Sequence, residues 1–311
     1  MSYLPNFDSM KSSHGWSDPA VIDNFLAHQL LRGRLAIILG AGASFGFKLP
    51  GWSNLLQQMC NALKCAGPTS CGNLPQFAGD LLRNKFSGNK PQFWEAVRAA
   101  LYLDVKANES QLLNGAMLRA IGALAAASSR GKVGSVVSFN FDDLLEEYLQ
   151  VLGLTTSSTV DFPTWSQQTD VDVMHPHGLL PFKSTSAISE RGITFTDADY
   201  TAKIGDINDP WNRKVSDVMT THTCLFIGLS GDDERLKSLI FNANKMHPSI
   251  TSDQFPFWGV VTRLADTSDD DRVSRWKEHG VHSKRFGSYD EVPDWLLGIC
   301  RRAAKIRSQT R

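Results

Sequence analysis

The hydrophobic residues of this chain occur in short unbroken runs, separated by stretches in which they recur every three or four positions. A short apolar run that ends in glycine or a polar residue is typical of a strand buried on both faces of a parallel sheet. Apolar residues at a spacing of three and four indicate helices with one buried face. Strands are therefore predicted at 35–39, 134–139, 172–174, 223–228 and 257–261, with an edge strand at 192–196 and a short strand at 281–286.

Helical stretches are predicted before and between these strands. Asp18 and Pro19 are typical of the N-cap and first position of a helix, which Gly33 would end. A second helix is predicted to begin at Asn140, because apolar residues from 141 to 149 follow a period of 3.6. Further helices are predicted at about 53–63, 77–86, 92–103, 111–127, 197 onward, 234–243, 269–278 and 291–304.

Strands that alternate with helices indicate an α/β fold with an open, mainly parallel sheet and helices on both faces. The predicted helices within 53–131 lie between two strands, so they would form a helical insert lobe. We expect a single domain over residues 1–311, with a loosely ordered polar lead-in at 1–17. The last residues, 301–311, contain five basic and no acidic side chains. We expect a solvated tail there, and a partner-binding arm is the alternative.

Composition narrows the class of protein. The 311 residues are 42% hydrophobic and 21% charged, with a net charge of zero and a pI near 7.1. A chain with this charge balance lacks the excess of basic residues that direct binding to nucleic acid or to an anionic membrane requires. The five cysteines lack C-x-x-C pairs, which favours reduced thiols. There is no signal peptide and no apolar run of about 18 residues, so a cytoplasmic location is expected.

The first predicted strand leads into the glycine-rich turn at 40–44. Gly40 and Gly42 permit a tight turn and a close approach to a ligand, and the following helix would direct free N–H groups at a phosphate. We interpret the turn as a dinucleotide pyrophosphate site. The alternative is a strand-to-helix turn that binds no ligand.

The fingerprint of nicotinamide-dependent dehydrogenases does not fit this turn. That fingerprint, G-x-G-x-x-G, would need glycine where Phe45 stands. It also needs an acidic residue about 20 positions later to bind the adenosine ribose. No acidic residue occurs between Ala43 and Gly79. A hydride-transferring enzyme is therefore disfavoured.

Polar or glycine-containing motifs follow four predicted strands, at 40–44, 140–142, 177–178 and 228–233. Ligands of open parallel sheets bind outside the carboxyl ends of the strands, so these motifs are expected to share one crevice. These motifs also have a structural alternative. Asn140 or Ser230 could be the N-cap of a helix. Asp142 or Asp233 could be a carboxylate in the first turn, where the helix dipole stabilises a negative charge.

Two histidines at the third of these motifs raise the question of a metal. His175 and His177 could share an ion, but no third ligand with suitable spacing follows. No metal is therefore expected. A lone histidine such as His177 is also more often structural than catalytic.

Taken in order, the motifs resemble the sirtuin-like domain of prokaryotic antiphage defence proteins, over about residues 30 to 300. That resemblance implies a Rossmann-like, NAD-binding α/β domain with a helical insert. It also implies cleavage of the nicotinamide–ribose bond of NAD+, and defence through depletion of cellular NAD, known as abortive infection. The motifs that carry the resemblance are Gly40-Ala-Gly-Ala-Ser44, Leu49-Pro-x-Trp52, Phe139-Asn-Phe-Asp142, His177-Gly178, Thr196-x-x-Asp-Tyr200 and Gly228-x-Ser-x-x-Asp233.

Site residues follow from the resemblance by position. It implies that Asn140 and His177 are catalytic and that Asp142 is the acid of the same loop. It further implies NAD+ as the substrate, with contacts on the phosphate side and nearer the adenosine. The residues expected to bind NAD+ are Gly40, Ala41, Gly42, Ser44, Phe45, Gly228, Ser230 and Asp233.

Two other functions stay open. Deacylating sirtuins carry a zinc ribbon of two C-x-x-C pairs after the catalytic histidine, and only Cys224 and Cys300 follow His177 here. An NAD-dependent protein deacylase is therefore the first alternative. A catalytically silent module that senses NAD or ADP-ribose is the second.

Control of an NAD hydrolase is also expected, because unrestrained activity would be toxic to its own cell. We expect a homo-oligomer or a regulatory protein partner. Relatives with similarly compact chains pair with a HerA-type ring ATPase, which we prefer, or with a short Argonaute.

Overall fold

A computed structural model describes residues 19–68, 73–126, 128, 131–161, 169–183, 188–189, 192–204, 206, 208–247, 257–265 and 275–309. Within these residues the strands form one sheet of seven, in the order β3-β4-β2-β1-β5-β6-β7, and every neighbouring pair is parallel. The strands are β1 (Leu35–Leu39), β2 (Ser135–Ser138), β3 (Thr156–Thr159), β4 (Val171–Met174), β5 (Thr223–Ile227), β6 (Gly259–Leu264) and β7 (Val281–Phe286).

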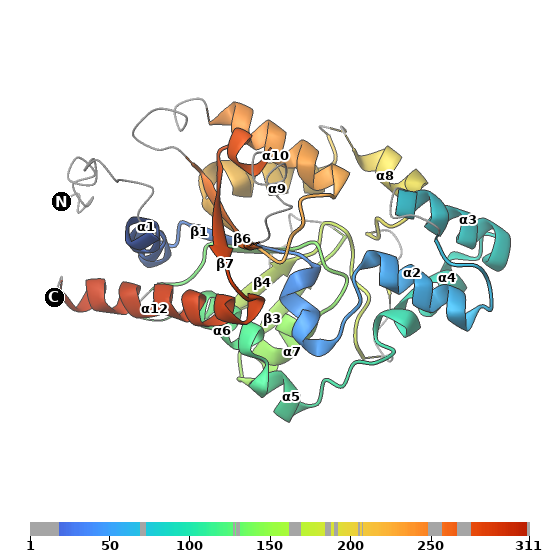
Figure 1. Cartoon of the computed structure of the whole chain (residues 1–311), viewed down its shortest axis with the longest axis horizontal. Coiled ribbons are helices and arrows are strands. Elements are labelled where there is room, and N and C mark those ends of the chain that lie inside the picture. The colour runs from blue at the N-terminus through green and yellow to red at the C-terminus, as the bar shows by residue number, and fades with distance from the viewer. Residues whose placement is uncertain are drawn as a thin grey trace.

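Helices cover both faces of this sheet, and a group of helices extends from one end of the molecule (Figure 1). One face carries α1 (Pro19–Leu31), α6 (Ala116–Ala125), α7 (Leu144–Val151) and α12 (Val292–Gln309), and the other carries α9 (Pro210–Thr221) and α10 (Glu234–Met246). The remaining helices are η3 (Ala41–Phe47), α2 (Trp52–Ala62), α3 (Leu74–Phe86), α4 (Lys90–Leu101), α5 (Glu109–Asn114), α8 (Asp197–Lys203) and η6 (Tyr289–Glu291).

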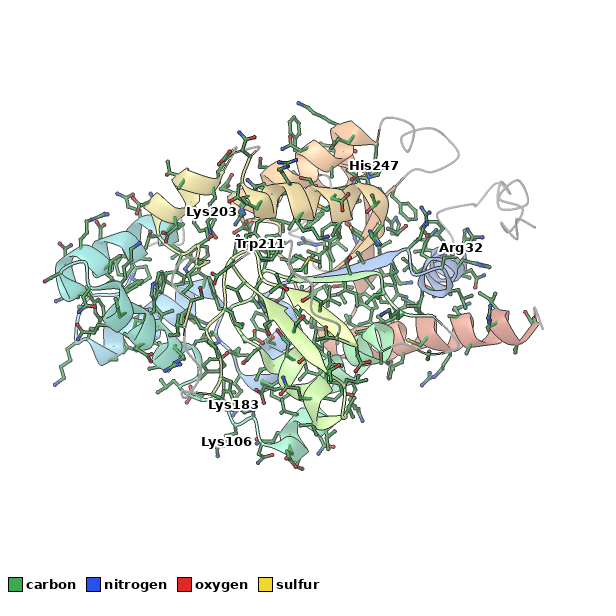
Figure 2. All side chains as sticks on the ribbon, turned by 180° about the vertical axis from the view of Figure 1, so that it is seen from behind. Arg32, Lys106, Lys183, Lys203, Trp211 and His247 are labelled. Carbon is green, nitrogen blue, oxygen red and sulfur yellow. The ribbon has the colours of Figure 1, made fainter. Side chains whose placement is uncertain are left out.

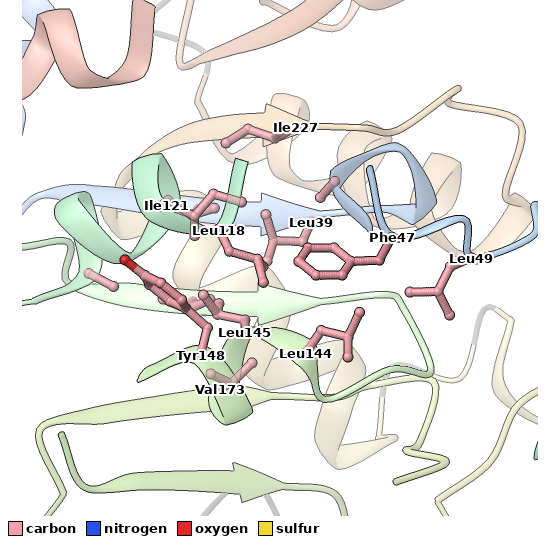
Figure 3. Packing of buried hydrophobic residues seen from close by; sticks show 14 of the residues in the cluster. Leu39, Phe47, Leu49, Leu118, Ile121, Leu144, Leu145, Tyr148, Val173 and Ile227 are labelled. Carbon is pink, nitrogen blue, oxygen red and sulfur yellow. The ribbon is translucent and has the colours of Figure 1, made fainter. Parts of the chain in front are cut away.

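The two faces bury alternate residues of the same strands. On β1, Ile37 packs with the α1, α6, α7 and α12 side, and Ile38 packs with the α9 and α10 side. Both are fully buried, which is why β1 is an unbroken apolar run. Figure 3 shows the hydrophobic core on the side of α1, α6, α7 and α12. There Leu39 lies among Phe47 of η3, Leu118 of α6 and Leu145 of α7.

The strands next to β1 end at the same level. Leu39 is in register with Ser138 of β2 and with Ile227 of β5, and Val137 is in register with Met174 of β4. The chain leaves β1 toward β2 and later returns to β5 on the other side of β1. This reversal between β1 and β5 is where ligands of open parallel sheets bind.

The predicted α/β class, the parallel sheet and the helices on both faces are confirmed. The predicted edge strand at 192–196 is wrong, because this segment has no strand pairing and leads directly into α8. Neither β3, whose polar residues contain no apolar run, nor α9 was predicted from the sequence.

Several helix boundaries differ from the predictions. The helix expected from Asn140 begins at Leu144, because residues 140–143 form a loop. The single helix expected at 111–127 is two helices, α5 and α6, with extended backbone at Gly115 between them. Residues 301–309 continue α12. Three predictions lie outside the described residues: the cap at Asp18, the lead-in at 1–17 and most of the helix at 269–278.

No helix in the described part of the chain combines the length and apolar character that a membrane span requires.

Candidate functional site

The glycine turn after β1 packs directly against the turn after β5. A Cβ on Gly42 would lie 2.7 Å from Gly228 Cα, and one on Gly40 would lie 2.4 Å from Leu229 Cδ2. Gly228 has φ +73°, and a Cβ there would lie 2.3 Å from the Ala43 nitrogen. These glycines therefore permit the close approach of two chain segments at the reversal between β1 and β5.

Three backbone N–H groups of this turn donate within the chain. The N–H groups of Gly40 and Gly42 donate to the carbonyl oxygens of Ile227 and Gly228, each at 2.9 Å, and Ala43 N–H donates to Gly40 O. The glycine pattern thus has a structural explanation here. The prediction that it also binds phosphate stays a prediction.

Ser44 joins this turn to the loop that follows β2. Its Oγ donates to both carboxylate oxygens of Asp142, at 3.1 and 3.0 Å. Asn140 Nδ2 donates to Gly40 O at 3.0 Å and to Ser44 Oγ at 3.3 Å. Gly40, Ser44, Asn140 and Asp142, about 100 positions apart in sequence, thus form one buried network.

These bonds give the Asn140 amide a fixed direction. Its two N–H groups are used by Gly40 and Ser44, so its Oδ1 is the atom left to accept a hydrogen bond. Its backbone N–H donates to Ser138 Oγ, which holds the loop in place of a helical turn.

Burial raises the pKa of Asp142 to about 6, although the Ser44 hydrogen bond acts in the opposite direction. Burial also raises the pKa of the neighbouring Asp143 to about 7, against the hydrogen bond from Phe182 N–H. Near pH 6 the loop therefore holds carboxyl groups that can exchange protons, which is a feature of functional sites.

His177 lies in the turn after β4, with only 4% of its surface exposed. Its ring contacts Phe139 edge-on at 4.9 Å between centroids and Tyr200 at 5.7 Å, and it stacks near Phe141 at 6.5 Å. Two of these aromatic residues flank Asn140 in the sequence, so the His177 ring lies beside the loop that carries Asn140.

The Nε2 atom of His177 is buried and has no hydrogen-bond partner among the described residues. Asp233 Oδ2 lies 3.9 Å away and accepts a hydrogen bond from the Tyr200 hydroxyl at 2.7 Å. Burial lowers the pKa of His177 to about 4, and the attraction of Asp233 only partly opposes this. At neutral pH the imidazole is therefore uncharged, and its contact with Asp233 is not an ion pair.

His175 is buried like His177 but differs in its hydrogen bonds and in the direction of its pKa shift. Its Nε2 bonds to Glu146 Oε1 at 2.7 Å and its Nδ1 bonds to Asn140 O at 3.3 Å. Burial lowers the pKa of His175, but the charge and hydrogen bond of Glu146 outweigh it, so the net shift is upward. Both nitrogens are engaged, which removes His175 as a ligand of a metal shared with His177. In the described part of the chain no group of three or more metal-binding side chains occurs.

The other predicted site residues lie around this centre. Asp233 caps α10 by accepting from Leu236 N–H at 2.7 Å, and Ser230 is exposed and accepts from Asp232 N–H. Ala41 is exposed, and Phe45 is 54% exposed. A pocket of about 490 Å³ lies beside η3, and none of Gly40, Asn140, Asp142 and His177 lines it. It is lined by Phe45, Lys48, Leu49, Pro50, Gly51, Asn54, Gln57 and Gln58.

Sequence reasoning missed three residues of this centre. Glu146 is fully enclosed and also accepts from Ser158 Oγ, yet its helical spacing resembles that of a surface residue. Tyr200 was noted only as part of a motif. Arg235 follows the capping residue of α10 and is 1% exposed, and an arginine so near a helix start carried no visible signal.

A small cavity of about 10 Å³, at the lower limit for holding one water molecule, lies beside the Asn140 network. Its polar lining comes from Ser44, Ser138, Asn140, Asp142 and Glu146.

Comparison with known proteins finds a family model that matches part of the chain. Residues 134–283, just under half of the chain, match the SIR2-like domain. A solved structure titled "Structural Basis for the Mechanism and Regulation of Sir2 Enzymes" is similar over 92% of this chain and 98% of that chain, at 14% identity and a TM-score of 0.47. No curated protein matches. Asn140 and His177 both lie inside the matched segment.

Proposed function

We propose that this protein is an NAD+ glycohydrolase, which cleaves the nicotinamide–ribose bond to give nicotinamide and ADP-ribose. The observation that carries the proposal is the buried imidazole of His177, whose Nε2 has no hydrogen-bond partner among the described residues. A buried polar atom without a partner is unfavourable, so a hydroxyl group of a bound ligand would satisfy it. The SIR2-like match makes a ribose hydroxyl of NAD+ the natural candidate.

The chemistry suits these residue types. Nicotinamide leaves as a neutral molecule, so the site needs no general acid of the kind that ordinary glycosidases use. His177 is neutral near pH 7 and can accept a proton from a ribose hydroxyl or from water. Asn140 Oδ1 can orient that water, and the Asp142 carboxylate can offset the positive charge that develops on the ribose.

The structure supports contacts to the ribose of NAD+ better than contacts to its phosphates. The N–H groups of Gly40, Gly42 and Ala43 already bond within the chain. Phosphate contacts at this turn, and adenosine contacts at Gly228 and Ser230, rest on the resemblance alone.

The biological role that fits this activity is antiphage defence through depletion of NAD. A toxic hydrolase needs control, and we include in the proposal a homo-oligomer or a regulatory partner, with a HerA-type ring ATPase preferred over a short Argonaute. Mass in solution and co-purification with a neighbouring gene product test this part. NAD levels measured in infected cells test the role itself.

The enzymatic proposal is tested by nicotinamide release from NAD+, with and without an acylated peptide. A hydrolase releases nicotinamide without the peptide, and a deacylase, the first alternative, does so only with it. Tight NAD binding without any release would indicate the silent sensing module.

Single substitutions test the catalytic roles of Asn140 and His177. We expect Asn140→Ala and His177→Ala each to lower turnover on the order of 100-fold or more, with folding intact. Asn114→Ala and His279→Ala serve as matched controls, because these residues lie on other elements. Near wild-type turnover of both site variants would refute the assignment.

A further inference from the structure

Arg235 is a buried arginine with an unusual set of partners. It is the second residue of α10 and only 1% exposed. Its Nη1 donates to Pro176 O at 2.7 Å, its Nη2 to Asp209 Oδ1 at 2.8 Å and its Nε to Asn212 Oδ1 at 2.8 Å. Burying a guanidinium group is unfavourable unless its donors are paired, and here three of its five N–H groups, one on each nitrogen, have an acceptor.

The acceptor Pro176 O belongs to the peptide bond that leads into His177. The carbonyl of His177 itself accepts from Thr194 N–H at 2.9 Å. The backbone on both sides of the imidazole is therefore held, by Arg235 before it and by Thr194 after it. Without Arg235, the Pro176 carbonyl would lose this donor in a buried segment, and the peptide bond before His177 would lose this restraint.

The partners of Arg235 tie this turn to α9. Asp209 is the N-cap of α9 and also accepts from Asn212 N–H. Asn212 Nδ2 in turn donates to Lys203 O at 2.7 Å, at the end of α8. Figure 2 shows Lys203 and Trp211 at the two ends of the connection between α8 and α9. One guanidinium thus links α8, α9 and α10 to the turn that carries His177.

The same helix start also places a charge near the ring. Asp233, two residues before Arg235, faces His177 Nε2 at 3.9 Å and is held by the Tyr200 hydroxyl. Of the groups around His177, Asp233 favours the charged imidazole, whereas Arg235 and Lys203 disfavour it.

We propose that Arg235 is a positioning residue for catalysis, which holds the imidazole of His177 toward the substrate through its hydrogen bond to the Pro176 carbonyl. This inference rests on the proposed function. A purely structural buried ion pair is the competing explanation, and the two differ in what happens to His177 when the protein stays folded.

The test compares Arg235→Met with Arg235→Lys and with a control at a second buried arginine, Arg98→Met on α4. Arg98 is 9% exposed and pairs with Glu95, far from the site in sequence and on another element. Methionine keeps an apolar stem and removes every donor, and lysine keeps the charge but not the planar fork. Each variant is measured for thermal melting, for kcat and KM of nicotinamide release, and for the NMR titration of His177, which is assigned with His177→Ala.

We expect Arg235→Met to lower kcat on the order of 100-fold with KM changed less than about threefold. Arg235→Lys should recover part of this loss. The His177 titration should move to higher pH in Arg235→Met and stay in place in Arg98→Met. If Arg235→Met does not fold, Arg235→Lys carries the same comparison.

The two proposals fail in different ways. A wild-type protein that releases no nicotinamide refutes the hydrolase, and the His177 titration still shows whether Arg235 acts on the ring. An active wild type with unchanged kcat and unchanged His177 titration in folded Arg235 variants overturns the positioning role.

Discussion

Asp142 gives a prediction that does not depend on the proposed activity. Its carboxyl group is 8% exposed and accepts from Ser44 Oγ and from Leu144 N–H, yet burial raises its pKa from 3.8 to about 6. The folded protein therefore holds this proton more tightly than the unfolded chain. In the Asp142→Asn variant the side chain would have nearly the same shape, would still accept from Ser44, and would never ionise.

The sign and size of the change in stability with pH follow from the difference between the folded and unfolded pKa of Asp142. A raised carboxyl pKa means that the stability contribution is fully present below about pH 3.8 and is lost as the pH rises through about 6. At about 1.4 kcal/mol per pH unit, the loss amounts to about 3 kcal/mol. Between pH 4 and pH 8, where most of this loss occurs, Asp142→Asn should therefore gain about 2.4 kcal/mol in free energy of unfolding relative to wild type.

Urea denaturation at several pH values from 4 to 8 measures this difference directly. Asp217→Asn on the exposed side of α9 sets the baseline for the loss of one surface charge. A constant difference between Asp142→Asn and wild type across this pH range would show that the carboxyl group is not strained by burial, and the reasoning would be wrong.

Three further predictions concern the surroundings of the site. Glu146→Gln breaks the buried pair with His175 and should destabilise the protein by about 3–5 kcal/mol, measured by urea denaturation. Because the pKa of His175 is raised in the folded state, this contribution is present below pH 6.5 and should shrink as the pH rises above it. Gly228→Ala should lower stability by about 2–5 kcal/mol, from its φ of +73° and the contact with Ala43 N, whereas Gly46→Ala, with open space around it, should melt like wild type. Addition of EDTA should leave nicotinamide release unchanged, which an assay with and without the chelator decides.

The architecture was predictable because buried parallel strands have a strong sequence signature. The run at 35–39 and the strands at 135–138 and 223–227 were found from apolar residues alone. Since the ends of parallel strands meet at one edge, the meeting of Gly40, Asn140 and Gly228 motifs followed from the topology.

The missed strand β3 and the wrongly predicted strand at 192–196 each have a specific cause. β3 consists of Thr156-Ser-Ser-Thr159, and its pairing with β4 is supported by hydroxyl groups that donate to Asp172, which no apolar pattern reveals. Ile193 and Phe195 alternate with threonines as in a strand, but Thr194 N–H bonds to His177 O and its Oγ1 accepts from Lys203. The alternation reflects burial of a loop against the site.

The orientation of the site side chains could not be predicted from spacing. Asn140 has the residue type and position of a helix N-cap, and the helix instead begins four residues later. The difference arises because Asp142 Oδ1 accepts from Leu144 N–H and Asp143 Oδ1 accepts from Phe182 N–H. These carboxylates hold the loop, and the Asn140 amide is left to bond with Gly40.

The two histidines of the turn after β4 show how neighbouring residues acquire opposite chemistry. Both are almost fully buried, and burial alone would lower both pKa values. His175 meets an otherwise enclosed carboxylate at 2.7 Å, and that pair raises its pKa. The carboxylate nearest His177 is 3.9 Å away and is held by Tyr200, and Arg235 adds a positive charge, so His177 stays neutral. A proton acceptor must be neutral before it acts, and His177 meets that condition near pH 7.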